Sequence, residues 1–237
     1  GRYEHVAERL SRAGFNVVAL DHQGRGRSEG ERGYFPRFEH VVSDCLRCAD
    51  ATLPTSSDAL PAFLLGHSMG GLLALNVAAR SQRWRGVLVS APALRVQKPP
   101  TAAALRLYQL LSKHVPKLEV LPAMPPALLS RDPAVIAAYV NDPLVHRGKM
   151  TVRVACELLH WMEKTAAAAA CFTAPCLFMH GTADAVTPLS GSTAFVESAG
   201  SADKRLIRYE GLLHEILNEP EKEDVLRDVI NWINARI

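Results

Sequence analysis

The residue pattern that most clearly indicates chemistry is Gly66-His67-Ser68-Met69-Gly70, a G-x-S-x-G motif. An apolar run at residues 62–65 precedes the motif, and an apolar helical pattern at residues 72–80 follows it. A strand, tight turn and helix in this order form a nucleophile elbow, which exposes the Ser68 hydroxyl at the start of the helix. Because the turn is tight, we expect Gly66 and Gly70 to be required on either side of Ser68. The alternative is a glycine-rich turn with a structural serine.

A serine hydroxyl is a poor nucleophile until a base removes its proton, so a histidine and an orienting carboxylate must accompany Ser68. After an elbow of this kind, the acid and then the histidine follow in the chain, each just past the end of a later strand. Asp184 follows the apolar run 176–179, and His214 follows the run 205–209. The sequence therefore predicts Ser68, Asp184 and His214 as nucleophile, acid and base. Competing acids in a loop or on a helix surface are Asp203, Asp224 and Asp228.

Two further groups near the predicted triad have expected roles. The backbone N–H of Met69, the residue after the nucleophile, is the expected oxyanion donor. A second donor normally comes from a loop that would lie before Gly1. His180 precedes Asp184 by four residues, and we interpret it as a packed or backbone-bonded histidine rather than a catalytic one.

Short apolar runs alternate with helical patterns along most of the chain, which predicts an α/β fold with a mostly parallel sheet covered by helices on both faces. The expected strands are residues 15–20, 62–65, 86–89, 176–179 and 205–209, and the expected helices include 3–13, 38–53, 72–80 and 224–237. Residues 92–171 interrupt this alternation with helical patches at 102–111 and 152–162 and no convincing strand. We therefore predict a core of residues 1–91 and 172–237 and a helical cap inserted at 92–171.

Composition excludes several classes of protein. The 237 residues are enough for one large domain, and no apolar run reaches the length of a membrane span. Five dispersed cysteines indicate a reducing, cytoplasmic location, and we interpret Cys45 and Cys48 as plain thiols rather than half of a metal site. The net charge of +3 does not point to nucleic acid. Residues 92–165, however, hold ten Lys and Arg against five Asp and Glu, so the predicted cap is basic.

These features together resemble the monoacylglycerol lipase and lysophospholipase branch of the α/β-hydrolases. The resemblance covers the whole chain and is carried by Gly1-Arg2-Tyr3, residues 21–30 (DHQGRGRSEG), residues 65–71 (LGHSMGG), residues 141–144 (NDPL), residues 181–184 (GTAD) and His214. It implies an α/β-hydrolase fold, hydrolysis of a monoacylglycerol or lysophospholipid ester, and no metal or organic cofactor. It also implies that early strands and a His-Gly oxyanion loop precede Gly1, so that this chain lacks its front end.

The same resemblance places Arg2 and Tyr139 near the glycerol-binding end of the pocket. The alternative is a surface arginine and a tyrosine packed in the cap. A second expectation concerns membranes, because a basic and apolar cap could rest on an anionic bilayer and make the protein peripheral to it. The residues of that patch are Arg106, Lys113, Lys117, Leu107, Leu110 and Leu111, and a solvated charged face is the alternative.

Two other functions remain open at this stage. One is a truncated, non-catalytic hydrolase-like protein that binds lipids. The other is a proline-iminopeptidase-like peptidase, or an acyltransferase, on the same scaffold. A peptidase should carry acidic residues near the cap for the substrate amine, whereas this cap is basic.

Overall fold

Four parallel strands form the central sheet of the computed structural model, which describes residues 1–53 and 60–237. They are β1 (Ala62–His67), β2 (Trp84–Ser90), β5 (Cys176–Gly181) and β6 (Lys204–Tyr209), paired in the order β1-β2-β5-β6. Four of the predicted runs therefore form strands, and their parallel pairing is confirmed. Because side chains alternate across a strand, Val87 and Val89 enter one core while Leu88 enters another.

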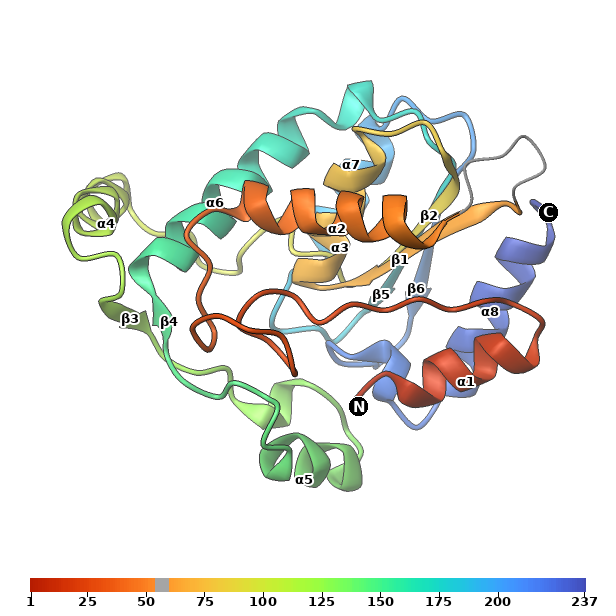
Figure 1. Ribbon diagram of the computed structural model, residues 1–237, viewed down its shortest axis with the longest axis horizontal. Coiled ribbons are helices and arrows are strands. Elements are labelled where there is room, and N and C mark those ends of the chain that lie inside the picture. The colour runs from red at the N-terminus through yellow and green to blue at the C-terminus, as the bar shows by residue number, and fades with distance from the viewer. Residues whose placement is uncertain (54–59) are drawn as a thin grey trace.

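Helices cover both faces of the sheet, as predicted (Figure 1). On one face lie α2 (Phe38–Thr52), α3 (Met69–Ala78), α6 (Val152–Ala167) and α7 (Leu189–Ser198). On the other lie α1 (Glu4–Arg12) and α8 (Lys222–Asn234), whose Val6 and Val229 belong to the second core. Helix α3 is buried on all sides, including Leu72, Leu73 and Leu75, because it lies between the sheet and the helices α2 and α6. This central helix is the one that follows the G-x-S-x-G motif.

Residues 15–20 do not form the predicted strand. A strand requires a paired neighbour, and no described residue pairs with this segment in the sheet, which ends at β1 on that side. The exposed fractions of Val17 and Val18 are 40% and 55%. The β-branched run predicted a buried strand from local pattern alone, but pairing depends on other segments.

Residues 92–171 contain the predicted helices and, between them, four further elements that the sequence did not predict. Helix α4 (Ala102–His114) and helix α6 confirm the patches 102–111 and 152–162. Between them lie β3 (Glu119–Leu121), the short helix η1 (Pro126–Leu128), α5 (Pro133–Asn141) and β4 (Met150–Thr151). Strands β3 and β4 pair antiparallel, so the prediction of no strand in this segment was wrong. The division of the chain into core and cap at residues 92 and 171 stays a prediction.

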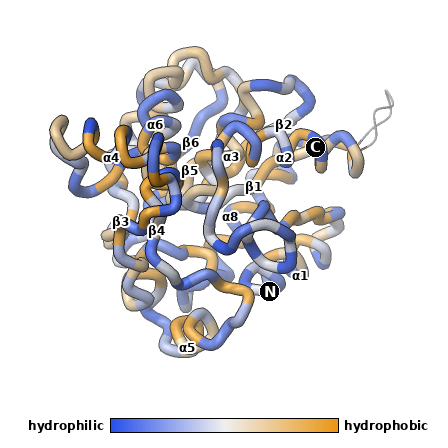
Figure 2. The backbone as a smooth tube through the Cα atoms, turned by 60° about the vertical axis from the view of Figure 1, so that its left-hand side comes forward, coloured by the Kyte–Doolittle hydropathy of each residue, from blue (hydrophilic) through white to orange (hydrophobic). Residues whose placement is uncertain are grey.

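Helices α4 and α5 lie at the periphery of the molecule, and Figure 2 shows hydrophobic residues on both. By contrast, α6 packs its Val154 and Trp161 into the core beside α2 and α3. No helix in the described ranges is both long and apolar enough to span a bilayer. The remaining short helices are η2 (Ala169–Cys171) and η3 (Ile216–Asn218), and η3 connects the loop after β6 to α8.

Candidate active site

Ser68 occupies the predicted turn between β1 and α3. Its backbone has φ 55° and ψ −117°, a left-handed conformation that costs energy for any residue with a side chain. Four backbone hydrogen bonds hold it. Ser68 N–H donates to Ser90 O at 2.9 Å, and Ser68 O accepts from the N–H groups of Gly71 and Ala93 at 3.0 Å and of Leu72 at 3.1 Å. The strand–turn–helix arrangement of a nucleophile elbow is thus confirmed.

The room for a side chain at the glycines beside Ser68 differs from the prediction that Gly66 and Gly70 are both required. A Cβ on Gly66 would lie 2.1 Å from Gly70 O, so residue 66 must be glycine. A Cβ on Gly70 would meet nothing within 4 Å, which contradicts the expectation that this position has no room. The second constraint falls on Gly71, where a Cβ would approach the Cβ of Pro92 to 2.9 Å. The difference arises because Gly71 faces the segment after β2.

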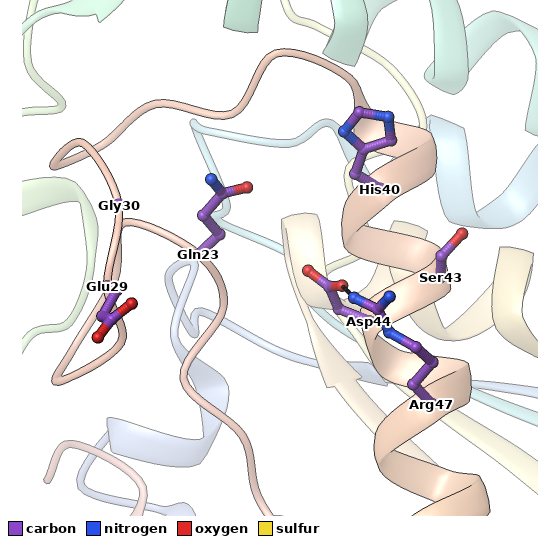
Figure 3. Close-up of a pocket in the computed structure, with 7 residues that line it drawn as sticks. All are labelled: Gln23, Glu29, Gly30, His40, Ser43, Asp44 and Arg47. Atoms are coloured by element: carbon purple, nitrogen blue, oxygen red, sulfur yellow. Dashed lines mark hydrogen bonds and ion pairs between the residues drawn. The ribbon is translucent and has the colours of Figure 1, made fainter.

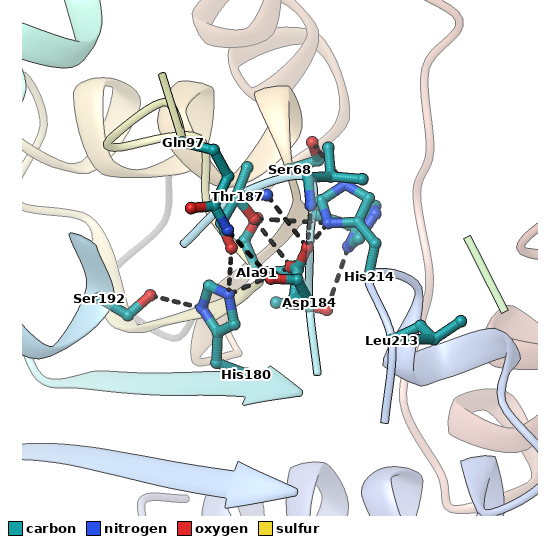
Figure 4. Close-up of polar contacts among 12 residues, drawn as sticks. Ser68, Ala91, Gln97, His180, Asp184, Thr187, Ser192, Leu213 and His214 are labelled. Carbon is teal, nitrogen blue, oxygen red and sulfur yellow. Dashed lines mark hydrogen bonds and ion pairs between the residues drawn. The ribbon is translucent and has the colours of Figure 1, made fainter. Parts of the chain in front are cut away.

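The structure brings Ser68, His214 and Asp184 into one hydrogen-bonded chain (Figure 4). Ser68 Oγ lies 3.0 Å from His214 Nε2, and His214 Nδ1 lies 2.8 Å from Asp184 Oδ2. Asp184 follows β5 and His214 follows β6, and both side chains are buried. The competing acids are engaged elsewhere in the structure, with Arg236 for Asp203, Arg227 for Asp224 and Tyr209 for Asp228.

Five donors surround the carboxylate of Asp184. Oδ1 accepts from the backbone N–H groups of Val186 at 2.7 Å and Thr187 at 3.0 Å. Oδ2 accepts from Thr187 Oγ1 at 2.9 Å and is also the oxygen that faces both histidines, His214 and His180. Burial alone would raise the pKa of Asp184, but the hydrogen bonds from His180 and His214 outweigh it and hold the pKa well below its ordinary value. An ionised Asp184 fixes the proton of His214 on Nδ1 and leaves Nε2 free to accept one from serine.

His180 is fully buried and bonded on both ring nitrogens. Its Nε2 lies 2.9 Å from Thr187 O and 3.1 Å from Asp184 Oδ2, and since both oxygens only accept, Nε2 carries the proton. Its Nδ1 lies 2.8 Å from Ser192 Oγ. The interpretation of His180 as a packed, backbone-bonded histidine is confirmed, although the sequence did not indicate its contact with the acid.

His67, the second residue of the motif, also contacts the base. Its ring centroid lies 4.7 Å from that of His214, and its Nδ1 lies 3.1 Å from Ser90 Oγ. Burial and the neighbouring His214 hold the pKa of His67 well below its ordinary value, so the ring is neutral. The motif spacing alone did not reveal this contact, because it depends on where β6 places His214.

The two residues predicted to bind the substrate alcohol lie together in the structure. The guanidinium carbon of Arg2 lies 4.6 Å from the centroid of the Tyr139 ring on α5. Arg2 also forms an ion pair with Glu215, which immediately follows His214. Met69, the predicted oxyanion donor, is the first residue of α3, a position whose N–H has no partner inside the helix.

Two hollows differ in their relation to these residues. One of about 780 Å³ is lined by Leu213, the residue before His214, together with residues of η1, α5 and the segment between them. The other, of about 670 Å³, lies between residues 23–30 and α2 and is lined by polar side chains (Figure 3). Ser43 in that hollow donates to the backbone of Glu39 and Arg47 pairs with Asp44, so it contains no activated nucleophile.

Cys45 and Cys48 both lie on α2. Cys45 Sγ lies 4.0 Å from Nδ1 of His22, and burial raises the pKa of this thiol to about 11, so it is protonated at neutral pH. In the part of the chain that the structure describes, no three His, Cys, Asp or Glu residues are grouped to hold a metal ion.

The chain is similar in sequence and in structure to known hydrolases. The family model described as "Serine aminopeptidase, S33" matches residues 1–221. The monoacylglycerol lipase of Mycolicibacterium smegmatis is 38% identical over 238 residues, which cover 100% of this chain and 84% of that protein. The monoglyceride lipase of Mus musculus is 34% identical over 241 residues, covering 100% and 79%. The crystal structure of Paleococcus ferrophilus monoacylglycerol lipase superposes with a TM-score of 0.90 and 32% identity, covering 100% and 90% of the two chains.

Proposed function

The chain belongs to the family described as serine aminopeptidase S33, it is a serine hydrolase with the α/β-hydrolase fold, and we propose that it cleaves the ester bond of monoacylglycerols. The resemblance to the monoacylglycerol lipase branch is thereby confirmed. The observation that carries the proposal is the hydrogen-bonded chain from Ser68 through His214 to Asp184. The names of the relatives support a lipid ester as the substrate.

The three side chains divide the reaction between them. His214 Nε2 accepts the hydroxyl proton as Ser68 Oγ attacks the ester carbonyl, and Asp184 stabilises the imidazolium that forms. When the tetrahedral intermediate collapses, the bond to glycerol breaks and His214 returns the proton to the glycerol oxygen. Water then attacks the acyl-enzyme with His214 again as the base, and a fatty acid is released.

Groups around the triad supply the remaining interactions. The N–H of Met69 donates to the oxyanion of each tetrahedral intermediate, because it adjoins Ser68 at the start of α3. Arg2 and Tyr139 form the glycerol-binding end of the site, which is supported by their mutual contact and by the ion pair of Arg2 with Glu215, the residue after His214.

Active-site labelling tests the proposal directly. A fluorophosphonate probe should label the wild-type chain and should fail to label Ser68→Ala, with circular dichroism showing that both are folded. Hydrolysis assays should then release fatty acid from 1-monooleoylglycerol. A folded wild-type chain that takes no label would support the non-catalytic lipid-binding alternative.

Substrate comparison separates the proposal from the other enzymes. Lysophosphatidylcholine tests for a lysophospholipase, and proline 4-nitroanilide tests for a peptidase of the iminopeptidase type. Faster release from either substrate than from 1-monooleoylglycerol would contradict the assignment. Transfer of the acyl group to added glycerol in preference to water would indicate an acyltransferase.

We also propose that α4 contacts anionic membranes. Its Leu107 and Leu110 are 52% and 57% exposed, and Arg106 and Lys113 lie exposed beside them. Lys117, also predicted in this patch, instead pairs with Glu31 at 2.6 Å and contributes less free charge. Apolar side chains flanked by cations favour an anionic bilayer surface.

Vesicle sedimentation tests this contact. Binding should be stronger to vesicles with 30% phosphatidylglycerol than to pure phosphatidylcholine, and R106E/K113E should weaken it. The control R205E/R208E changes the net charge equally on exposed residues of β6 and should retain binding. Equal binding to both vesicle types, or equal loss in both double variants, would refute a contact through α4.

A further inference from the structure

Glu219 is a fully buried carboxylate that follows η3 and joins two distant parts of the chain. Its Oε1 accepts from the backbone N–H of Leu213 at 2.8 Å. Its Oε2 accepts from the backbone N–H of Arg131 at 3.1 Å and from its guanidinium Nε at 3.2 Å, with Ser130 Oγ at 3.4 Å. A buried charge is tolerated only when such donors compensate it, so this carboxylate depends on both sets of partners.

These partners flank the proposed base on one side and α5 on the other. Leu213 immediately precedes His214, whereas Ser130 and Arg131 lie just before Asp132, the N-cap of α5. A second bond runs parallel to the first, since the N–H of Glu215 donates to Leu129 O at 2.8 Å. The backbone on both sides of His214 is therefore attached to residues 129–131.

Helix α5 has another connection to the same loop. Tyr139 on this helix lies under Arg2, and Arg2 pairs with Glu215. The residues before and after His214 are thus held by groups near both ends of α5. Displacement of α5 would move the hydrogen bonds that place the imidazole.

We propose that Glu219 is a positioning residue, which holds His214 at hydrogen-bond distance from Ser68 and ties that distance to the segment leading into α5. The inference rests on the proposed function, because it takes His214 as the base. Its physical basis is the short span from Glu219 to Leu213 N–H and from there to the imidazole, one residue along the chain. Misplacement of a catalytic group by about 1 Å can cost roughly 10²-fold in rate.

The test compares Glu219→Gln with Glu221→Gln. Glu221 also pairs with Arg131, but its side chain is 42% exposed and no bond joins it to Leu213 in the described structure. In E219Q the amide NH2 faces N–H donors on one side, so one of the two attachments is lost. Fluorophosphonate labelling rates and kcat on a water-soluble short-chain ester should fall by about 10²-fold in E219Q, with KM changed by less than about threefold. The same constants should stay within about threefold of wild type in E221Q.

Thermal unfolding distinguishes positioning from stability alone. A residue that only stabilises the fold would lower the melting temperature of E219Q and leave the labelling rate of the folded fraction unchanged, which would overturn the inference. If E219Q does not fold, Arg131→Ala replaces it, because this half-exposed side chain supplies one donor to Glu219. That variant should label several-fold more slowly than E221Q, and equal rates would overturn the inference. A wild-type chain that takes no label would refute the proposed function as well.

Discussion

Alanine substitution should destabilise the protein at Gly66 but not at Gly70, although the G-x-S-x-G motif requires glycine at both positions. In Gly66→Ala the new methyl carbon would lie 2.1 Å from Gly70 O and 2.5 Å from Gly70 C. Ordinary van der Waals contact begins near 3.4 Å, so β1 and the start of α3 must separate by about 1 Å. In Gly70→Ala the methyl carbon meets nothing within 4 Å.

The magnitude follows from the packing of this region. Overpacking by a methyl group in a rigid site costs about 1–3 kcal/mol, and each 1 kcal/mol lowers the melting temperature by roughly 2–4 °C in a domain of this size. Gly66→Ala should therefore melt about 2–12 °C below wild type. It should also take fluorophosphonate roughly 10²-fold more slowly, because Ser68 lies between the separating elements. Gly70→Ala should melt at or slightly above the wild-type temperature, since alanine favours a helix over glycine.

Differential scanning fluorimetry and labelling kinetics, run on wild type and both variants, give the result. Gly71→Ala should have a melting temperature between those of the other two variants. Its methyl carbon would approach Pro92 Cβ to 2.9 Å, a milder clash than the one with Gly70 O. Equal melting temperatures for the Gly66 and Gly70 variants, or a larger loss at Gly70, would refute the steric reasoning.

Three further predictions concern the acid of the site and the support of α3. Asp184→Asn should lower kcat by about 10⁴-fold, because an amide favours the wrong tautomer of His214, and unchanged kcat would contradict the assignment. The folded pKa of Asp184 lies below its ordinary value of 3.8, so its stabilisation is present above that pH and is lost on acidification. In urea titrations wild type should accordingly lose more stability than Asp184→Asn between about pH 5 and pH 3, and parallel losses would count against this. Thr165→Val removes an acceptor 2.8 Å from the buried Asn76 amide and should cost about 1–3 kcal/mol in urea unfolding with unchanged labelling, whereas slowed labelling would imply a role in the site.

The candidate triad could be predicted because each member is marked by local pattern. The G-x-S-x-G turn indicated Ser68, and Asp184 and His214 each follow an apolar run that ends in a short turn. In a parallel sheet the carboxyl ends of the strands share one edge, so the order of the elements along the chain sufficed to bring the three together.

Features that depend on distant partners were missed or mispredicted. Residues 15–20 have the composition of a strand, but pairing is set by other segments. Helix α5 is the exception among the features that were missed, because it carries local signals. Asp132 caps it by accepting from Ala134 N–H at 2.8 Å, and Pro133 occupies the first helical position. Glu219 lies among other acidic residues that suggest a solvated surface, and its burial follows only from tertiary packing.

The distance along the chain between the two ends of the catalytic hydrogen bond has a consequence for folding. Ser68 and His214 are separated by 146 residues. The intervening chain supplies β2, β5 and β6, and also Ser130 and Arg131, which donate hydrogen bonds to Glu219. Contacts of such large sequence separation form late, because the entropy cost of closing the loop comes before the contact can stabilise the structure. Reactivity toward a fluorophosphonate should therefore emerge in the final phase of refolding, after the far-ultraviolet circular dichroism has recovered, which makes the nucleophile a covalent reporter of completed assembly.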